Sequence, residues 1–183
     1  MLSSHCWKAA LQLLERAGYS VAVLKLKASH FGLPQKRLRA FVVCTLGGSA
    51  EQTRDLQRRA RDVSTRTPTT MRDVFPDMQT YFQWGCHKDP HIHATDQPCI
   101  TLRHCCAARA TPRKFKQTAR CAGPLADTHF LTIPELCAIQ GLDNYRFPPD
   151  MSDSRMGMQI GNSVCPPVMK WVMEQLEFSQ GPQ

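Results

Sequence analysis

The sequence predicts a mixed α/β chain, made of the edge of an α/β sheet, a small loop-rich lobe and closing helices. Three observations predict it: a helix–strand–turn–strand pattern at the start, an irregular basic stretch in the middle, and two well-marked helices near the end. The 183 residues suffice for one ordinary domain, or for a small domain with an appendage. Apolar residues make up 42% of the chain, so a packed core is expected.

Residues 1–48 are expected to form the edge of the sheet. Ser4 is placed to cap a first helix, in which apolar residues recur at helical spacing until Gly18. Two strands are expected at residues 19–26 and 39–46, with a turn between them. The second strand is almost continuously apolar, which is typical of a strand buried on both faces. Two strands make the edge of such a sheet and not a whole one.

Residues 49–128 are expected to form a small, ordered, loop-rich lobe. The zone opens with an arginine-rich run that we interpret as a short surface helix, and a short helix or turn should end before Pro76. Beyond it, proline, histidine and cysteine recur with no sustained period. Four aromatic residues between positions 75 and 84 give the lobe an apolar centre. Long connections without regular structure are usually functional or disordered.

Residues 129–183 are expected to close the chain with two helices. Thr132 and Glu135 have the spacing of a capping box, and Gly141 should end the helix that they begin. A loop rich in proline and aspartate follows. A Pro-Pro pair then stands at the first turn of the last helix, where the missing N–H groups cost nothing.

Charge is distributed unevenly along the chain. The net charge is +8, but residues 1–126 hold 20 Lys and Arg against eight Asp and Glu, whereas residues 127–183 hold three against seven. Between residues 97 and 126 there is no acidic residue, while six basic ones occur. Such a field favours a polyanionic partner, most often nucleic acid, and a merely solvated basic face is the alternative.

The nine cysteines are an odd number and no signal peptide precedes them, which favours reduced thiols in an intracellular compartment. That compartment would be nuclear if the source is eukaryotic and cytoplasmic if it is bacterial. No run approaches the ~18 consecutive apolar residues of a membrane span, so no membrane partner is expected. A zinc-binding module is an alternative for the lobe, but without a Cys-x-x-Cys pair no metal site is expected. The cluster that raises it comprises Cys86, His87, His91, His93, Cys99, His104, Cys105 and Cys106.

Three short blocks carry the most specific signal in the sequence. They read Phe-Gly-Leu-Pro-Gln-Lys-Arg-Leu-Arg at residues 31–39, Leu-Thr-Ile-Pro-Glu-Leu-Cys-Ala-Ile-Gln-Gly at 131–141 and Gln-Ile-Gly-Asn-Ser-Val-Cys-Pro-Pro at 159–167. In this order they resemble motifs eight, nine and ten of the cytosine-5 DNA methyltransferase family. The irregular zone then stands at the place of the target-recognition region. The middle block departs from the pattern, because His129 and Pro134 stand where the family usually has arginines.

The resemblance implies a fold and an activity. The chain would be the C-terminal part of a class I S-adenosylmethionine-dependent methyltransferase, with a Rossmann-like sheet and a target-recognition lobe. The family transfers a methyl group from S-adenosylmethionine to C5 of a cytosine in double-stranded DNA, after the base has been taken out of the stack. A cysteine thiolate adds to C6 of the base, and a glutamate assists at the ring.

The resemblance also assigns roles to residues of the first and third blocks. Arg39 matches the arginine that stabilises negative charge near the C2 carbonyl of cytosine. Asn162, Ser163 and Val164 match the block that borders the cofactor pocket. The simpler alternatives are solvated turn arginines and an ordinary Gly-Asn turn before a helix. Gln35 and Arg37 match positions that orient the loop and approach the DNA backbone. The expected DNA-binding residues are Gln35, Arg37, Arg103, Arg109, Arg113, Lys114 and Lys116.

Three earlier blocks of the family are not found in the sequence. These are Phe-x-Gly-x-Gly for the cofactor, Pro-Cys-Gln for the nucleophile and Glu-Asn-Val for the catalytic glutamate. We reject Cys99 as the nucleophile, because it follows the eighth block and its Pro-Cys-Ile context is wrong; a buried or loop thiol is expected there. The chain would therefore need a partner chain, or a missing N-terminal half, for catalysis. The alternatives are a non-catalytic DNA-binding module and an inactive truncated fragment.

Overall fold

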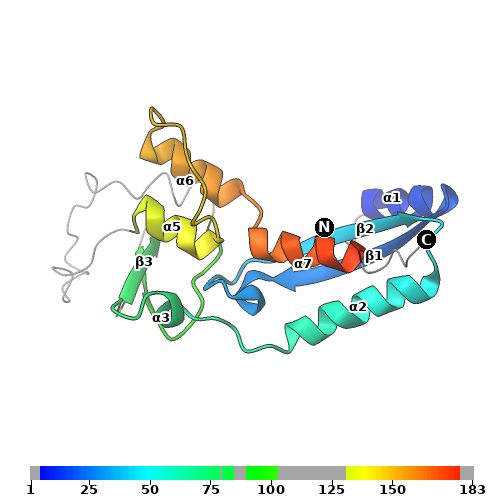
Figure 1. The fold of residues 1–183 in the computed structure, drawn as a ribbon, viewed down its shortest axis with the longest axis horizontal. Helices are drawn as coiled ribbons and strands as arrows, with labels where there is room; N and C mark the ends of the chain where they lie inside the picture. The colour runs from blue at the N-terminus through cyan, green and yellow to red at the C-terminus, as the bar shows by residue number, and fades with distance from the viewer. Residues whose placement is uncertain (1–4, 79, 85–89, 103–130, 178–183) are drawn as a thin grey trace.

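The computed structural model describes residues 5–78, 80–84, 90–102 and 131–177 (Figure 1). Its elements in chain order are α1 (His5–Arg16), β1 (Tyr19–Lys27), the 3₁₀ turn η1 (Ala28–Phe31), β2 (Leu38–Leu46), α2 (Ala50–Ser64), α3 (Met71–Val74), β3 (Thr80–Trp84), β4 (Pro90–Ala94), α5 (Ile133–Gln140), α6 (Asp153–Asn162) and α7 (Pro166–Glu177). Within these ranges, no helix is both long and apolar enough to cross a membrane. Ser4, the expected cap of the first helix, lies outside the described residues.

Strands β1 and β2 form an antiparallel hairpin. They pair along their whole length, from Tyr19 opposite Leu46 to Lys27 opposite Leu38. The connection is η1 followed by Gly32, whose φ of 80° lies in the left-handed region that glycine enters without a Cβ penalty. The two strands expected near the start of the chain are therefore confirmed, each to within one residue.

One face of this hairpin carries the first hydrophobic core. Leu24 and Leu26 are each 1% exposed, and they pack with Leu56 of α2 and with Val168 and Val172 of α7. The arginine-rich run is the 15-residue helix α2, longer than the short helix expected from the sequence. Because α2 shares this core, we group it with the hairpin and not with the lobe that was expected to begin at residue 49.

The opposite face of β2 contradicts the expectation of a strand buried on both faces. Leu38, Val42 and Leu46 are 54%, 39% and 68% exposed. Ala40 and Cys44, which lie between them on the same face, are exposed as well. Among the described residues, β2 pairs with β1 alone. Helices α1 and α2 both pack on β1, from opposite sides of the hairpin in Figure 1, but α1 contains no buried residue.

A second hydrophobic core lies at the other end of the molecule, around α3, α5 and α6 (Figure 1). Its most buried members are Met71, Cys99 and Ile139 at 0% exposed, with Ile160 at 1%. Helix α5 begins with the expected capping box, in which the Thr132 hydroxyl accepts from the Glu135 amide and the glutamate side chain accepts from the Thr132 amide.

Two regular elements were not expected from the sequence. Helix α6 occupies part of the segment expected to be a loop, and the β3–β4 hairpin lies in the zone expected to be irregular. Helix α6 contains two glycines and few apolar residues, so its sequence period is weak. Its buried positions, Gly157, Ile160 and Gly161, become recognisable only because α5 packs beside them. Strand β4 alternates histidine with single apolar residues, which gives an equally weak strand signal.

Gly141→Ala is expected to destabilise the fold more than the matched variant Gly32→Ala. Both glycines have φ near 80°, so each alanine costs about 1–2 kcal/mol of left-handed strain. At Gly141 an added Cβ would lie 2.9 Å from Pro167 Cδ and 3.0 Å from Leu33 Cδ2, whereas nothing lies within 4 Å at Gly32. Overpacking should add about 1–3 kcal/mol at Gly141 alone. Equal losses in urea unfolding of the two variants would contradict this packing.

Candidate functional site

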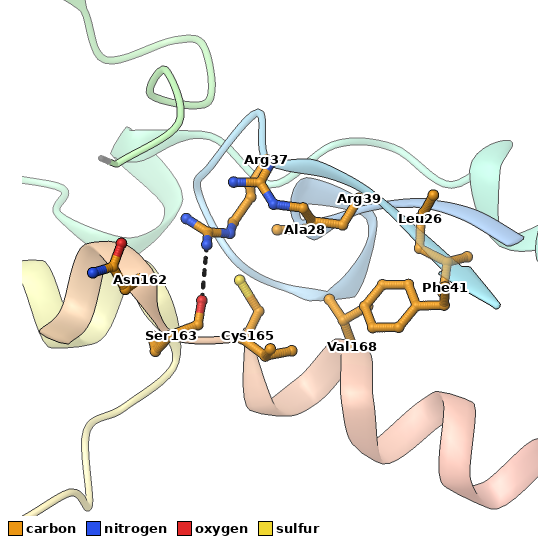
Figure 2. A pocket seen from close by; sticks show the side chains of 11 residues that line it. Leu26, Ala28, Arg37, Arg39, Phe41, Asn162, Ser163, Cys165 and Val168 are labelled. Atoms are coloured by element: carbon orange, nitrogen blue, oxygen red, sulfur yellow. Dashed lines mark hydrogen bonds between the residues drawn. The ribbon is translucent and has the colours of Figure 1, made fainter. Parts of the chain in front are cut away.

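A cavity of about 210 Å³ lies between the beginning of β2 and the corner that joins α6 to α7 (Figure 2). Leu26, Phe41 and Val168 form its apolar end, and two arginines face the corner at the other end. We refer to the three residues at the end of α6 and just after it, 162–164, as the 162–164 corner. The complete lining is Leu26, Ala28, Arg37, Arg39, Ala40, Phe41, Asn162, Ser163, Val164, Cys165 and Val168.

The bend before β2 determines where the two arginines point. Lys36 donates its backbone N–H to the Cys99 carbonyl at 2.7 Å, and Cys99 donates its own to the Pro34 carbonyl at 2.7 Å. These two bonds fix the bend to a segment more than sixty residues away in the sequence. Side chains alternate along an extended strand, so Arg37 and Arg39, two positions apart, lie on the same side and both line the cavity.

Arg37 joins three separate segments of the chain. Its side chain is buried, with 6% of the residue exposed. Nη1 donates to the carbonyls of Leu102 and Gly161 at 3.0 and 3.1 Å, and Nη2 donates to the Ser163 carbonyl at 2.8 Å. Burial, and next the charge of Arg39, lower the pKa of Arg37 from its ordinary value, yet a guanidinium keeps its charge in proteins. The hydrogen bonds are therefore charge-assisted.

Gln35 extends this arrangement to α5. It is fully buried; its Nε2 donates to Gln140 Oε1 at 2.8 Å and to the Ile139 carbonyl at 3.3 Å, and its Oε1 accepts from the Leu102 amide at 3.1 Å. Gln140 in turn donates from Nε2 to both the carbonyl and the hydroxyl of Ser163, each at 2.9 Å. We call Gln35, Arg37, Gln140 and Ser163 the buried polar network.

In the 162–164 corner, Ser163 is held by hydrogen bonds, whereas Asn162 and Val164 on either side of it are exposed. Ser163 is anchored by the buried polar network, and its hydroxyl also donates to the Ile160 carbonyl at 2.8 Å. Asn162 and Val164 are exposed, Val164 to 55%. An anchored backbone with exposed neighbours on the wall of a cavity is suited to contact a ligand. The three expected cofactor residues thus lie in the same cavity as Arg39.

Arg39 is the exposed cation of the cavity. Its Nη1 donates to the Leu38 carbonyl at 2.8 Å, the one side-chain hydrogen bond described for it. A guanidinium has five N–H donors, so the head retains donors for a carbonyl or an anionic oxygen in the cavity. The two arginines therefore differ in kind: Arg37 is occupied by protein carbonyls, and Arg39 is accessible.

Cys165 also lines the cavity, between the arginines and the apolar end, and the sequence reasoning assigned it no role. The sequence signal that could have placed Cys165 at the cavity was its position in the third block, at residues 159–167. Burial raises the pKa of Cys165 to about 11, although Arg37 and Arg39 oppose the shift. Burial also raises the pKa of Cys99, which is a fully buried thiol as expected. Neither thiol is a thiolate at neutral pH, and the thiolate is the nucleophilic form.

Most of the expected DNA-binding residues are outside the described part of the chain. Arg103, Arg109, Arg113, Lys114 and Lys116 all fall between residues 103 and 130. The cysteines and histidines at positions 86, 87 and 104–106 are likewise outside it. Across the ranges that are described, no three His, Cys, Asp or Glu side chains gather in a way that could hold a metal ion.

Arg37→Ala is expected to destabilise the fold strongly, whereas Arg39→Ala should change stability by less than about 0.5 kcal/mol. Removing Arg37 leaves three carbonyls, at Leu102, Gly161 and Ser163, without their charged donor, for a loss of about 3 kcal/mol or more. Among the described residues, the Arg39 side chain bonds only to the carbonyl of its own neighbour, Leu38. Urea unfolding followed by circular dichroism measures both variants, and a stable Arg37→Ala protein would contradict the role given to the network.

Alkylation should distinguish the exposed thiols from the cavity thiol. Cys6 and Cys44 are exposed and should react with iodoacetamide at pH 8. Cys165, with a pKa of about 11 and 3% exposure, should react slowly at pH 8 and faster only as the pH approaches 11. Peptide mass spectrometry assigns each site, and Cys165 labelling as fast as Cys44 at pH 8 would refute the burial described here.

Comparison with known proteins identifies the family. The model of the C-5 cytosine-specific DNA methylase family matches residues 1–104. Type II methyltransferase M.HgiDI of Herpetosiphon aurantiacus is 30% identical over 164 residues, covering 85% of this chain and 50% of its own. Type II methyltransferase M.NlaX of Neisseria lactamica is 26% identical over 185 residues, covering 90% and 54%. The chain therefore spans about half the length of these curated relatives.

Solved structures show the same fold at low sequence identity. The S. pombe Dnmt2 methyltransferase has a TM-score of 0.63 at 15% identity, covering 96% of this chain and 63% of its own. A mutant of Spodoptera frugiperda DNMT2 has a TM-score of 0.60 at 14% identity, covering 95% and 62%. The family model includes the block at residues 31–39, where the cavity arginines lie, and extends over more than half of the sequence. The chain belongs to the C-5 cytosine-specific DNA methylase family.

Proposed function

We propose that this chain is the C-terminal part of a DNA (cytosine-5-)-methyltransferase, which transfers a methyl group from S-adenosylmethionine to C5 of cytosine in double-stranded DNA. It acts together with a polypeptide that carries the nucleophile and the catalytic glutamate. One observation supports the proposal most directly: Arg39 and the 162–164 corner, from blocks more than 120 residues apart, line one cavity. The family assignment supports the type of chemistry.

The cavity is too small to be a complete binding site, and its size suits one part of such a site. Pockets that bury a whole drug-sized ligand measure about 300–1,000 Å³, and this cavity measures about 210 Å³. It combines an apolar wall with the accessible Arg39 cation, which suits a flat ring bearing a carbonyl. When bound, S-adenosylmethionine would supply the methyl group, and Asn162, Ser163 and Val164 would hold one side of it. The remaining walls then belong to the polypeptide that supplies the nucleophile.

Arg39 acts on the charge that develops in the base. As the thiolate adds to the cytosine ring, negative charge builds toward the C2 carbonyl, and the Arg39 guanidinium donates hydrogen bonds to that oxygen. A preorganised cation at developing charge is usually one of the largest contributions to a rate. Arg37 and Gln35 hold the bend that aims Arg39. The resemblance implied both this positioning role and an approach to the DNA backbone. Because both side chains are buried among protein groups, we propose the positioning role alone.

A DNA-binding module without catalysis is the second candidate, and the charge asymmetry of the chain favours it. The first 126 residues are strongly basic, and this alone would hold a duplex with steep salt dependence. The two candidates separate in one assay, in which the chain is mixed with the nucleophile-bearing polypeptide, labelled S-adenosylmethionine and a duplex. Methyl transfer supports the enzyme, while unchanged duplex binding without transfer supports the module.

Arg39→Ala should lower methyl transfer by the mixed proteins about 10²–10³-fold, with duplex affinity largely unchanged. The loss is expected because the cation acts on the transition state and contributes little to holding the duplex. Lys36→Ala is the matched control, since Lys36 is an exposed cation of the same bend outside the cavity. It should retain nearly full activity. An undiminished rate for Arg39→Ala, measured as tritium incorporated into DNA, would refute the assignment.

A further inference from the structure

Strand β2 presents a continuous apolar strip to the outside of the molecule. The strip consists of Leu38, Ala40, Val42, Cys44 and Leu46, all of which are exposed. We call these five residues the β2 strip. At about 3.3 Å per residue it is about 26 Å long. Single exposed apolar residues are common on protein surfaces. It is uncommon for a nine-residue strand to have an apolar residue at every outward position.

The outer edge of β2 is also unpaired within the described chain. β1 is its one partner there, so the N–H and C=O groups on the other edge of β2 meet no described strand. Natural edge strands are protected by charges, proline or bulges. β2 has none of these between Ala40 and Leu46, since its lone charge, Arg39, lies on the cavity side. This sequence is that of an interior strand, although β2 stands at an edge.

The length of the relatives indicates what should lie against β2. The chain covers 54% and 50% of two curated relatives and 63% of a solved one, so between about a third and a half of each relative is further polypeptide. Resting on the function proposed above, we propose that the β2 strip and the outer edge of β2 dock the polypeptide that carries the nucleophile. That polypeptide adds a β-strand to the open edge and covers the strip with apolar side chains.

A second copy of this chain is a poorer occupant. It would bring another net charge of +8 to the interface, and it would supply none of the missing length. The cavity gives an independent reason for a different polypeptide: Arg39 and Ala40, at the beginning of β2, are among the residues that line it. A partner that pairs with β2 therefore lies next to the site that it has to complete.

Val42→Glu tests the docking surface directly. The probe is the recombinant polypeptide from the same organism that carries the Pro-Cys-Gln block, and binding is measured by titration calorimetry without DNA or cofactor. Wild type should bind, and Val42→Glu should weaken binding at least tenfold, because a carboxylate would be buried in an apolar interface. Met158→Glu on α6 is the matched control, as Met158 is 43% exposed, compared with 39% for Val42. It should bind like wild type.

Cys44 provides a second readout that needs no substitution. It lies in the middle of the β2 strip and is exposed in the chain alone. Saturating partner should slow its alkylation by iodoacetamide at least tenfold, and hydrogen exchange of the β2 amides should slow with it. Leu46→Glu, at 68% exposure near the end of the strand, serves as a further variant that leaves the core untouched.

The outcomes separate docking from catalysis. Binding that Val42→Glu abolishes, with no methyl transfer by the wild-type pair, would support the docking surface and refute the proposed function. Methyl transfer that Val42→Glu and Leu46→Glu leave unchanged would overturn the docking surface and keep the function. Absence of binding by the wild type, or a homodimer of this chain that protects Cys44 in place of the probe, would overturn the docking proposal.

Discussion

The buried polar network is the constraint on which the rest of the molecule depends. Gln35 and Arg37 sit on the bend of the β1–β2 hairpin, yet every side-chain hydrogen bond that they make reaches residues 65 to 126 positions away. They join the hairpin, the segment at Leu102, the end of α5 and the 162–164 corner. Each buried donor and acceptor meets a partner, so the arrangement is strongly specified: a shifted bend would leave several of them unsatisfied at once.

This network explains why the cavity has its shape. One hydrophobic core lies under the hairpin and the other around α3, α5 and α6, and the network lies where the two meet. Arg37 fixes the Ser163 carbonyl, and Gln140 fixes the same oxygen from α5. With the corner held on one side and the bend on the other, the alternation of an extended strand brings Arg39 to the space between them. The position of the accessible Arg39 therefore depends on the hydrogen bonds of the buried Arg37.

Local signals in the sequence predicted local structure well. The capping box of α5 and the proline-initiated α7 depend on contacts within a few residues, and both were predictable. The sequence also predicted the Pro-Gln bend. It did not predict the burial of Gln35 and Arg37, because the carbonyls that accept their hydrogen bonds lie in distant segments. Helix α6 was missed because two of the three residues on its buried face, beside Ile160, are glycines, and that face is recognised only from its contact with α5. No window of sequence contains that information.

The failed expectation about β2 differs from the others, because there the sequence and the fold disagree. Its apolar run predicts burial on both faces, and the structure buries only the side of Val43. The buried side faces α2 and α7, and on it the groups of the buried polar network bond to one another and to backbone carbonyls, while Arg39 keeps free donors in the cavity. On the opposite side the β2 strip is exposed. The sequence of β2 thus suits a more buried environment than the described residues provide. The Cys165 thiol that lines the cavity is neutral at pH 7, so it does not supply the nucleophile of the proposed reaction. The exposed strip and the cavity meet at the beginning of β2, so the polypeptide that we propose beside this strand would cover the first and complete the second.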